Sequence, residues 1–88
     1  MFPFKEEIIS DNISIRTIPK EVSSDLLIWH MDKEDRIIYP IGDNDWKFQF
    51  DNELPINFNK KITIKKEVFH RLIKGKGDLK FLLFKVNI

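Results

Sequence analysis

The segment Leu79-Lys80-Phe81-Leu82-Leu83-Phe84-Lys85-Val86 contains one of the longest apolar runs of the chain. Side chains alternate between the two faces of a strand, and both faces of this segment are apolar apart from Lys80 and Lys85. Such a strand is either covered on both sides or lies where two molecules meet. The segment therefore predicts a strand that is buried on both faces or forms a dimer contact.

The composition of the whole chain also favours strands over helices. Its 88 residues include fourteen Ile and eight Phe but no Ala. Ala is the best helix former, whereas β-branched and aromatic residues are typical of pleated sheets. About eight short apolar segments separated by turns predict an all-β antiparallel sandwich or barrel, as a single domain spanning residues 1–88. The expected strands are residues 13–18, 26–32, 36–41, 46–50, 54–58, 62–64, 68–73 and 79–86.

The absence of Cys and of long apolar segments limits the possible reactions and the expected location of the protein. With no Cys there is neither a disulfide nor a thiolate nucleophile, so any metal must be held by His and carboxylate side chains. No apolar run is long enough to cross a bilayer, and the first residues lack the pattern of a signal peptide. We therefore expect a cytoplasmic protein. Its abundant Ile, Lys, Asn and Phe have AT-rich codons, which points to a bacterial or phage gene.

Charge is distributed unevenly along the chain. Residues 1–55 carry six basic and twelve acidic side chains, whereas residues 56–88 carry nine basic and two acidic ones. Attraction between neighbouring strands explains this asymmetry. The alternative is a basic face for phosphates, but the acidic half would repel nucleic acid, so we do not expect a nucleic-acid partner.

The aromatic series Trp46-Lys47-Phe48-Gln49-Phe50 allows two interpretations. Aromatic rings between polar residues can stack on single-stranded nucleic acid. A thin sandwich also needs large side chains in its core, and the complete alternation places all three rings on one face. We favour the core.

Only two histidines are present, and one of them has a carboxylate two residues away. In a strand, His30 and Asp32 share a face and provide two corners of a metal site. His70 lies in a second strand, which a rolled sheet can bring alongside. Together they form a candidate metal site of two His and one Asp.

The chain from about Leu26 to Ile73 resembles a small single-domain cupin. In that family the first motif is His-x-His followed by Glu, and the second is Gly-x5-Pro-x-Gly-x2-His. Residues 28–32 (Ile-Trp-His-Met-Asp) stand at the first motif, and residues 59–70 stand at the second with its spacing intact. The resemblance implies a cupin jelly roll with His30 and His70 as metal ligands.

Several positions depart from the family pattern. Asp32 replaces the second His of the first motif and can still bind a metal, whereas Arg36 stands near the Glu position and cannot. The second motif has Asn59, Lys65 and Glu67 where the family has Gly, Pro and Gly. The remaining set is similar to the two-His-one-carboxylate triad of non-haem iron oxygenases.

The resemblance implies a small-molecule-binding cupin with a divalent ion, Fe, Mn, Zn or Ni, and no organic cofactor. Arg36 would help to bind an anionic ligand, and Glu34 is a candidate fourth ligand of the metal or part of the ligand site. Oxygenase, isomerase and epimerase reactions all remain open, so the sequence does not decide whether the protein is an enzyme.

Three alternatives stay open beside the metal site. Arg36 could pair with Asp32 and leave a vestigial, metal-free cluster in a structural homodimer. A metal-free pocket could recognise a small anion through Arg36 and the histidines. A nucleic-acid or protein interaction module is the third. A homodimer is expected in any case, with Trp29 on the outer face of its strand as one candidate contact.

Overall fold

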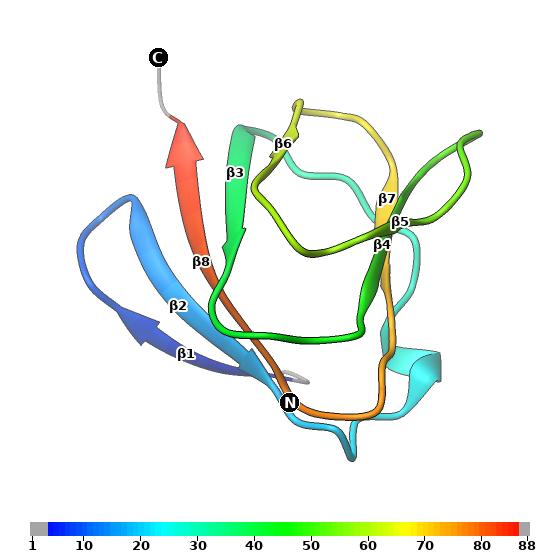
Figure 1. Ribbon diagram of the computed structural model, residues 1–88. Helices are drawn as coiled ribbons and strands as arrows, with labels where there is room; N and C mark the ends of the chain where they lie inside the picture. The colour runs from blue at the N-terminus through cyan, green and yellow to red at the C-terminus, as the bar shows by residue number, and fades with distance from the viewer. Residues whose placement is uncertain (1–3, 87–88) are drawn as a thin grey trace.

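Figure 1 shows the computed structural model of the protein, which describes residues 4–86. Eight strands and one short 3₁₀ helix form its regular structure within those residues. The strands are β1 (Lys5–Ile8), β2 (Ile13–Ile18), β3 (Asp35–Pro40), β4 (Lys47–Phe50), β5 (Ile56–Asn57), β6 (Ile62–Ile64), β7 (His70–Ile73) and β8 (Leu79–Val86). Every pairing between them is antiparallel, so the all-β antiparallel prediction is confirmed.

The strands form two sheets that face each other across the core. The larger sheet has the order β1-β2-β8-β3-β6 and the smaller one the order β5-β4-β7. Phe58, which follows β5, meets Phe81 of β8 with ring centroids 5.9 Å apart and so joins the two layers. The buried apolar side chains are Ile18, Val22, Ile38, Trp46, Phe48, Phe58, Ile62, Ile64, Leu79, Phe81 and Leu83.

Strand β8 lies inside the larger sheet, paired with β2 on one side and β3 on the other. The apolar side chains of its inner face, Leu79, Phe81 and Leu83, are each at most 5% exposed. Leu82 and Phe84 on the outer face are only half-buried. The prediction of burial is therefore confirmed for one face, and the dimer contact stays a prediction for the other.

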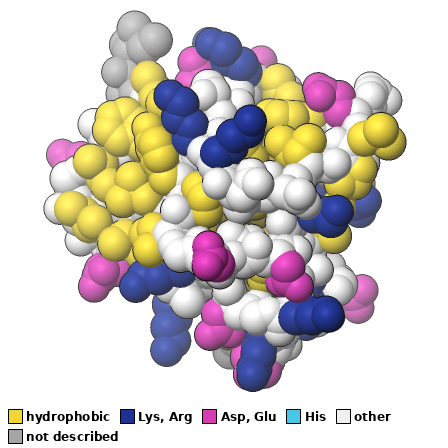
Figure 2. All heavy atoms as spheres, viewed as in Figure 1, with side chains coloured by type: hydrophobic (Ala, Val, Ile, Leu, Met, Phe, Trp, Pro, Cys, Tyr) yellow, Lys and Arg dark blue, Asp and Glu magenta, His cyan; other side chains and the backbone are white. Residues whose placement is uncertain are grey.

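The outer face of this sheet is apolar across its three central strands. Leu82 lies between Ile15 and Tyr39, and Phe84 lies between Ile13 and Ile37 in the hydrogen-bonded register. Figure 2 shows hydrophobic side chains gathered on the left of the view, where Figure 1 places β2 and β8.

The aromatic series of β4 belongs to the core, as predicted. Trp46 and Phe48 are each 1% exposed, and Phe48 contacts Phe50 edge to face with centroids 4.8 Å apart. The indole Nε1 of Trp46 donates a hydrogen bond to the Gly77 carbonyl oxygen at 2.8 Å. Buried rings cannot stack on a nucleic acid, so the stacking-platform alternative is wrong for Trp46 and Phe48.

The expected strand at residues 26–32 is wrong for most of its length. Ser24–Leu26 form the 3₁₀ helix, because the Ser23 hydroxyl accepts from the Asp25 amide at 3.3 Å and the Ser23 carbonyl accepts from the Leu26 amide at 3.0 Å. Only His30 makes a strand-like bridge. Strand β3 does not pair with this segment, because its partners are β6 and β8.

Other boundaries differ by smaller amounts. The expected strand 54–58 contracts to β5, the expected strand 68–73 begins at His70, and the expected strand 36–41 becomes β3, one residue earlier. Strand β1 was not expected, because Lys-Glu-Glu-Ile has no apolar alternation; it exists through its pairing with β2 at the sheet edge. Among residues 4–86, no helix is long and apolar enough to cross a membrane.

Candidate metal centre

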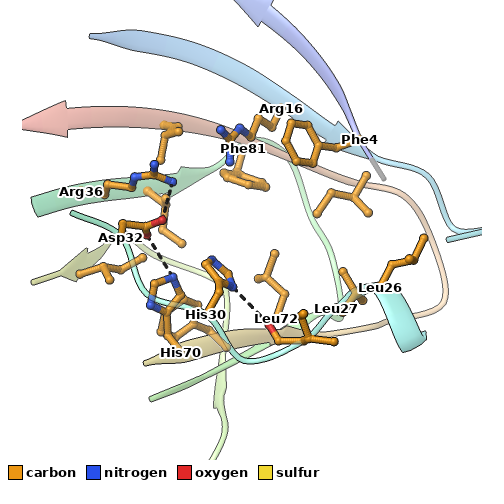
Figure 3. A pocket seen from close by; sticks show the side chains of 16 residues that line it. Phe4, Arg16, Leu26, Leu27, His30, Asp32, Arg36, His70, Leu72 and Phe81 are labelled. Carbon is orange, nitrogen blue, oxygen red and sulfur yellow. Dashed lines mark hydrogen bonds and ion pairs between the residues drawn. The ribbon is translucent and has the colours of Figure 1, made fainter. Parts of the chain in front are cut away.

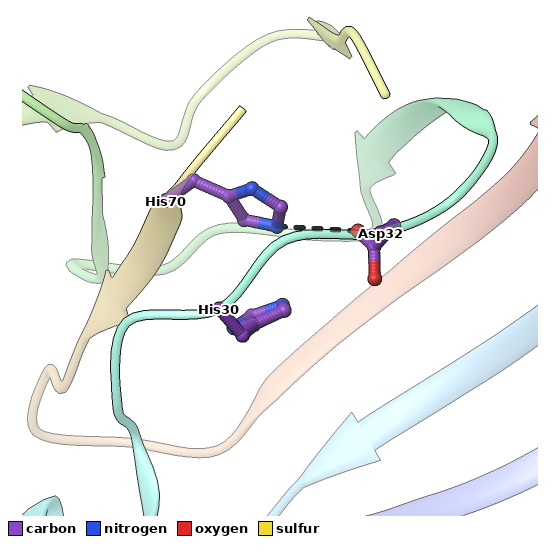
Figure 4. Close-up of side chains that lie close together, drawn as sticks. All are labelled: His30, Asp32 and His70. Atoms are coloured by element: carbon purple, nitrogen blue, oxygen red, sulfur yellow. Dashed lines mark ion pairs between the residues drawn. The ribbon is translucent and has the colours of Figure 1, made fainter. Parts of the chain in front are cut away.

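A reciprocal pair of backbone hydrogen bonds brings the two histidines together. The His30 amide donates to the His70 carbonyl at 3.0 Å, and the His70 amide donates to the His30 carbonyl at 2.9 Å. Residues paired in this way across an antiparallel bridge direct their side chains to the same face. The two imidazole centroids lie 4.3 Å apart. Figure 4 shows the two rings next to each other, with Asp32 beside His70. One bridge thus replaces the expected strand at this point.

Asp32 completes the cluster from two residues further along the same segment. One ligand atom from each of His30, Asp32 and His70 lies within 4.8 Å of the other two. The Glu67 amide donates to the Asp32 carbonyl at 2.7 Å and fixes the segment against the turn before β7. The structure therefore brings together the three residues that the sequence singled out.

Backbone carbonyls orient both imidazole rings. His30 Nδ1 lies 3.2 Å from the Ile28 carbonyl oxygen, and His70 Nδ1 lies 2.9 Å from the Val68 carbonyl oxygen. A carbonyl oxygen only accepts, so each Nδ1 carries the proton, and the Nε2 atom of a neutral ring keeps its lone pair. This is the arrangement in which metal-binding histidines are commonly held.

The carboxylate of Asp32 has one oxygen paired and one oxygen without a donor. Its Oδ1 lies 3.2 Å from Nη1 of Arg36. Its Oδ2 is buried and has no hydrogen-bond partner among the described residues. His70 Nε2 faces Oδ2 at 3.4 Å.

Two buried acceptors that face each other need a cation or a proton between them. Burial is the largest influence on His70 and lowers its pKa, which favours the neutral ring. Two neutral imidazole nitrogens and one carboxylate oxygen are a donor set suited to Fe(II), Mn(II), Zn(II) or Ni(II). The residues therefore fit the divalent ion that the cupin resemblance implies.

Arg36 forms ion pairs with Asp32 and with Glu34. Arg36 reaches the Glu34 Oε1 atom with Nη2 at 2.9 Å and with Nε at 3.1 Å. This hydrogen bond is the main reason that the pKa of Glu34 is lowered. Glu34 as a fourth ligand stays a prediction, and its pairing with Arg36 speaks against it.

The cluster lies at the wall of a cavity of about 540 Å³ (Figure 3). Most of the lining is apolar and comes from the inner faces of β2, β3, β4, β6, β7 and β8 and from the 3₁₀ segment. Arg16 and Phe4 also line the cavity, and the sequence analysis assigned neither of them to the site. The Arg16 guanidinium lies 4.4 Å from the centroid of the Phe4 ring, and Arg16 Nε donates to Glu6 at 2.6 Å. Arg16 has the same parity in β2 as the buried Ile18, and this signal could have placed it inside.

One residue that departs from the second cupin motif has an unfavourable backbone conformation. Glu67 stands at the second Gly position of the motif, and its φ is 62°. This left-handed conformation is natural for Gly and unfavourable for Glu. Glu67 is therefore strained in the turn before β7.

Comparisons with known proteins show the fold. No family model matches the sequence, and no curated protein matches it either. Among solved structures, an RmlC-like cupin family protein with a double-stranded β-helix fold from Methanocaldococcus jannaschii is 13% identical, with a TM-score of 0.68 over 98% of this chain and 82% of that chain. A cupin domain from Bordetella pertussis is 12% identical, with a TM-score of 0.65 over 97% and 92% of the two chains.

A third similar structure, FeII HppE, is 9% identical and has a TM-score of 0.63 over 84% of this chain and 41% of that chain. At these identities the likeness concerns the fold. The protein has the cupin double-stranded β-helix fold, and the resemblance inferred from the two motifs is confirmed.

Proposed function

We propose that this protein binds a small molecule next to a divalent metal ion held by His30, Asp32 and His70. The observation that carries the proposal is the pair of buried acceptors, His70 Nε2 and Asp32 Oδ2, which face each other at 3.4 Å. The likeness to FeII HppE supports it, because the name of that protein includes iron.

Each residue of the cluster has a distinct task in this proposal. His30 and His70 present Nε2 while carbonyl oxygens hold their Nδ1 protons. Arg36 occupies Oδ1 of Asp32, which leaves Oδ2 as the single oxygen available for coordination. When bound, a divalent ion acts as a Lewis acid that polarises or orients an anionic ligand.

The competing function is a structural homodimer with a vestigial site. It is favoured by the ion pair between Arg36 and Asp32, which compensates the carboxylate charge without any metal. A metal-free pocket for an anion is less well supported, because Glu34 and Asp32 already occupy three donor atoms of Arg36. A nucleic-acid module would bind with a steep salt dependence and without any response to chelators.

Elemental analysis of protein purified without a His tag from metal-supplemented medium tests the proposal directly. We expect about one divalent ion per chain in the wild type and loss of that ion in His30→Ala, His70→Ala and Asp32→Asn. Asp43→Asn is the matched control, because Asp43 is an exposed carboxylate outside the cluster. Circular dichroism verifies that each variant is folded.

Removing the metal with EDTA gives an independent readout. A ligand that binds only the folded state stabilises it, by about 2.7 kcal/mol at a free concentration one hundred times its Kd. We expect EDTA to lower the Tm of the wild type and of Asp43→Asn but not that of Asp32→Asn. A wild type without stoichiometric metal would instead support the structural homodimer.

A further inference from the structure

The polarity of the cavity lining restricts what the cavity can hold. Five of its sixteen lining residues are polar, and four of these are His30, Asp32, His70 and Arg36 at the metal centre. The fifth is Arg16, which already contacts Glu6 and Phe4. The other eleven are aliphatic or aromatic.

The lining also lacks the groups that recognise hydroxyl-rich ligands. No Ser, Thr, Asn, Gln or Tyr side chain lines the cavity within the described residues. A sugar placed against these apolar walls would lose its hydrogen bonds to water without replacement, at a cost for each buried hydroxyl. A hydrocarbon gains free energy with every methylene that leaves water.

The charges around the metal centre favour a negative charge on the ligand. Arg36, Arg16 and Lys85 contribute three positive charges, and Asp32, Glu34 and Glu6 contribute three negative ones. A divalent ion changes this local sum from 0 to +2. An anionic group next to the ion reduces this excess of positive charge in a low-dielectric cavity.

From these observations we propose that the ligand is an amphiphilic monocarboxylate with a hydroxyl-free hydrocarbon body. Its carboxylate lies at the metal centre, and its body lies against the apolar walls between the two sheets. Figure 3 shows the labelled apolar side chains of these walls to the right of His30 and Asp32. This inference rests on the proposed metal function. It adds the class of ligand, and it excludes sugars and sugar phosphates.

The cavity size is consistent with such a ligand. A volume of about 540 Å³ is in the range of pockets that enclose small organic molecules. Because each buried methylene adds about 0.8 kcal/mol, equivalent to about fourfold in Kd, affinity should rise with chain length until the cavity is full.

Calorimetric titration of the Zn²⁺-loaded protein tests the proposal with matched probes. Hexanoate and gluconate have the same carbon number and charge but differ in their hydroxyl groups. We expect hexanoate to bind more than about a hundredfold more tightly than gluconate, because the hydroxyls of gluconate lose their hydrogen bonds. Octanoate should bind about fifteenfold more tightly than hexanoate, and 1-octanol should bind at least about tenfold more weakly than octanoate.

A variant that fills the cavity separates this site from the exposed apolar surface. Leu27→Trp adds a large ring at a half-buried lining position, whereas Leu54→Trp adds it at a position that is 85% exposed and outside the lining. We expect Leu27→Trp to keep its zinc and to weaken octanoate binding by at least about tenfold. Leu54→Trp should bind octanoate like the wild type.

The two proposals fail in different ways. Zinc binding together with gluconate affinity equal to or above that of hexanoate would overturn the ligand class and leave the metal function intact. Octanoate affinity that is the same with and without zinc, or unchanged in Leu27→Trp, would overturn the placement of the ligand. Absence of zinc binding would overturn the metal function and, with it, this inference.

Discussion

The backbone of Glu67 leads to a substitution that should stabilise the protein. Glu67→Gly removes an exposed side chain from a residue with φ at 62°, and the amide of this residue donates to Asp32 at 2.7 Å. For a residue with a Cβ, the left-handed conformation costs about 1–2 kcal/mol. Gly avoids this cost but makes the unfolded chain more flexible, which costs about 0.4–1 kcal/mol. The expected net gain is about 0.5–1 kcal/mol.

Urea unfolding and thermal melts measure this gain. For a domain of this size, about 1 kcal/mol corresponds to about 4–8 °C in Tm, so we expect a rise of about 2–8 °C. The metal content should not change, because the hydrogen bond from the residue 67 amide to Asp32 needs no side chain.

The chain provides three matched controls for this substitution. Lys66→Gly changes the neighbouring residue of the same turn, which has no positive φ, and should destabilise by up to about 1 kcal/mol. Asn52→Gly changes another residue with φ at 63° and should gain only a few tenths of a kcal/mol, because Asn tolerates this conformation. Glu67→Gln tests the charge alone and should be neutral.

A Glu67→Gly protein that is less stable than the wild type would refute the argument. The same holds if Glu67→Gly and Lys66→Gly change stability in the same direction and by the same amount. Either result would mean that the turn does not strain residue 67.

Three further experiments address the centre, the packing and the outer face. In metal-free protein, the free energy of unfolding should be constant above about pH 6.5, the ordinary pKa of His, and should fall as the pH drops below it. Burial lowers the pKa of His70 in the folded state, so unfolding takes up a proton in this range. Urea unfolding between about pH 7 and 5 measures this pH dependence, and His70→Asn should remove it. Gly75→Ala should lower the free energy of unfolding by about 1–3 kcal/mol, because the new Cβ would lie 2.9 Å from the backbone carbonyl carbon of Asp45. At Gly77 a Cβ has no neighbour within 4 Å, so Gly77→Ala should change the free energy of unfolding by less than about 0.5 kcal/mol. Phe84→Lys on the outer face of the larger sheet should convert the expected homodimer into a monomer in light scattering, and a dimer that persists would place the contact elsewhere.

Regular alternation in the sequence was a reliable guide to the strands. The strands at Ile13–Ile18, Ile62–Ile64 and Leu79–Val86 have the predicted bounds. Side-chain parity identified the core face of Ile62–Ile64, whose two Ile side chains are buried. It did not do so for Ile13–Ile18, where Ser14 and Ile18 are buried and Ile13 and Ile15 are not. Composition also predicted the fold class, because a chain without Ala and with many β-branched residues favours sheets over helices.

The same reasoning failed where contacts from outside a segment decide its conformation. Residues 26–32 alternate like a strand, but Ser23 begins a 3₁₀ turn there and no neighbouring strand pairs beyond His30. Strand β1 has no pattern of its own and forms because β2 offers it an open edge. The conformation of such short segments depends on which strands lie next to them in the tertiary structure.

For the candidate site, the sequence by itself identified the three residues of the proposed donor set, His30, Asp32 and His70. Two histidines, one nearby aspartate and no cysteine leave one donor set, and the spacing of the second cupin motif identified His70 as its distant member. Tertiary structure alone decided that the His30 and His70 backbones pair, that Asp32 Oδ2 is buried without a donor, and that Arg16 and Phe4 line the cavity. The physical reason is distance along the chain. Groups forty residues apart come into contact only when the sheets pack around them. Burial then makes an acceptor without a hydrogen-bond partner energetically costly.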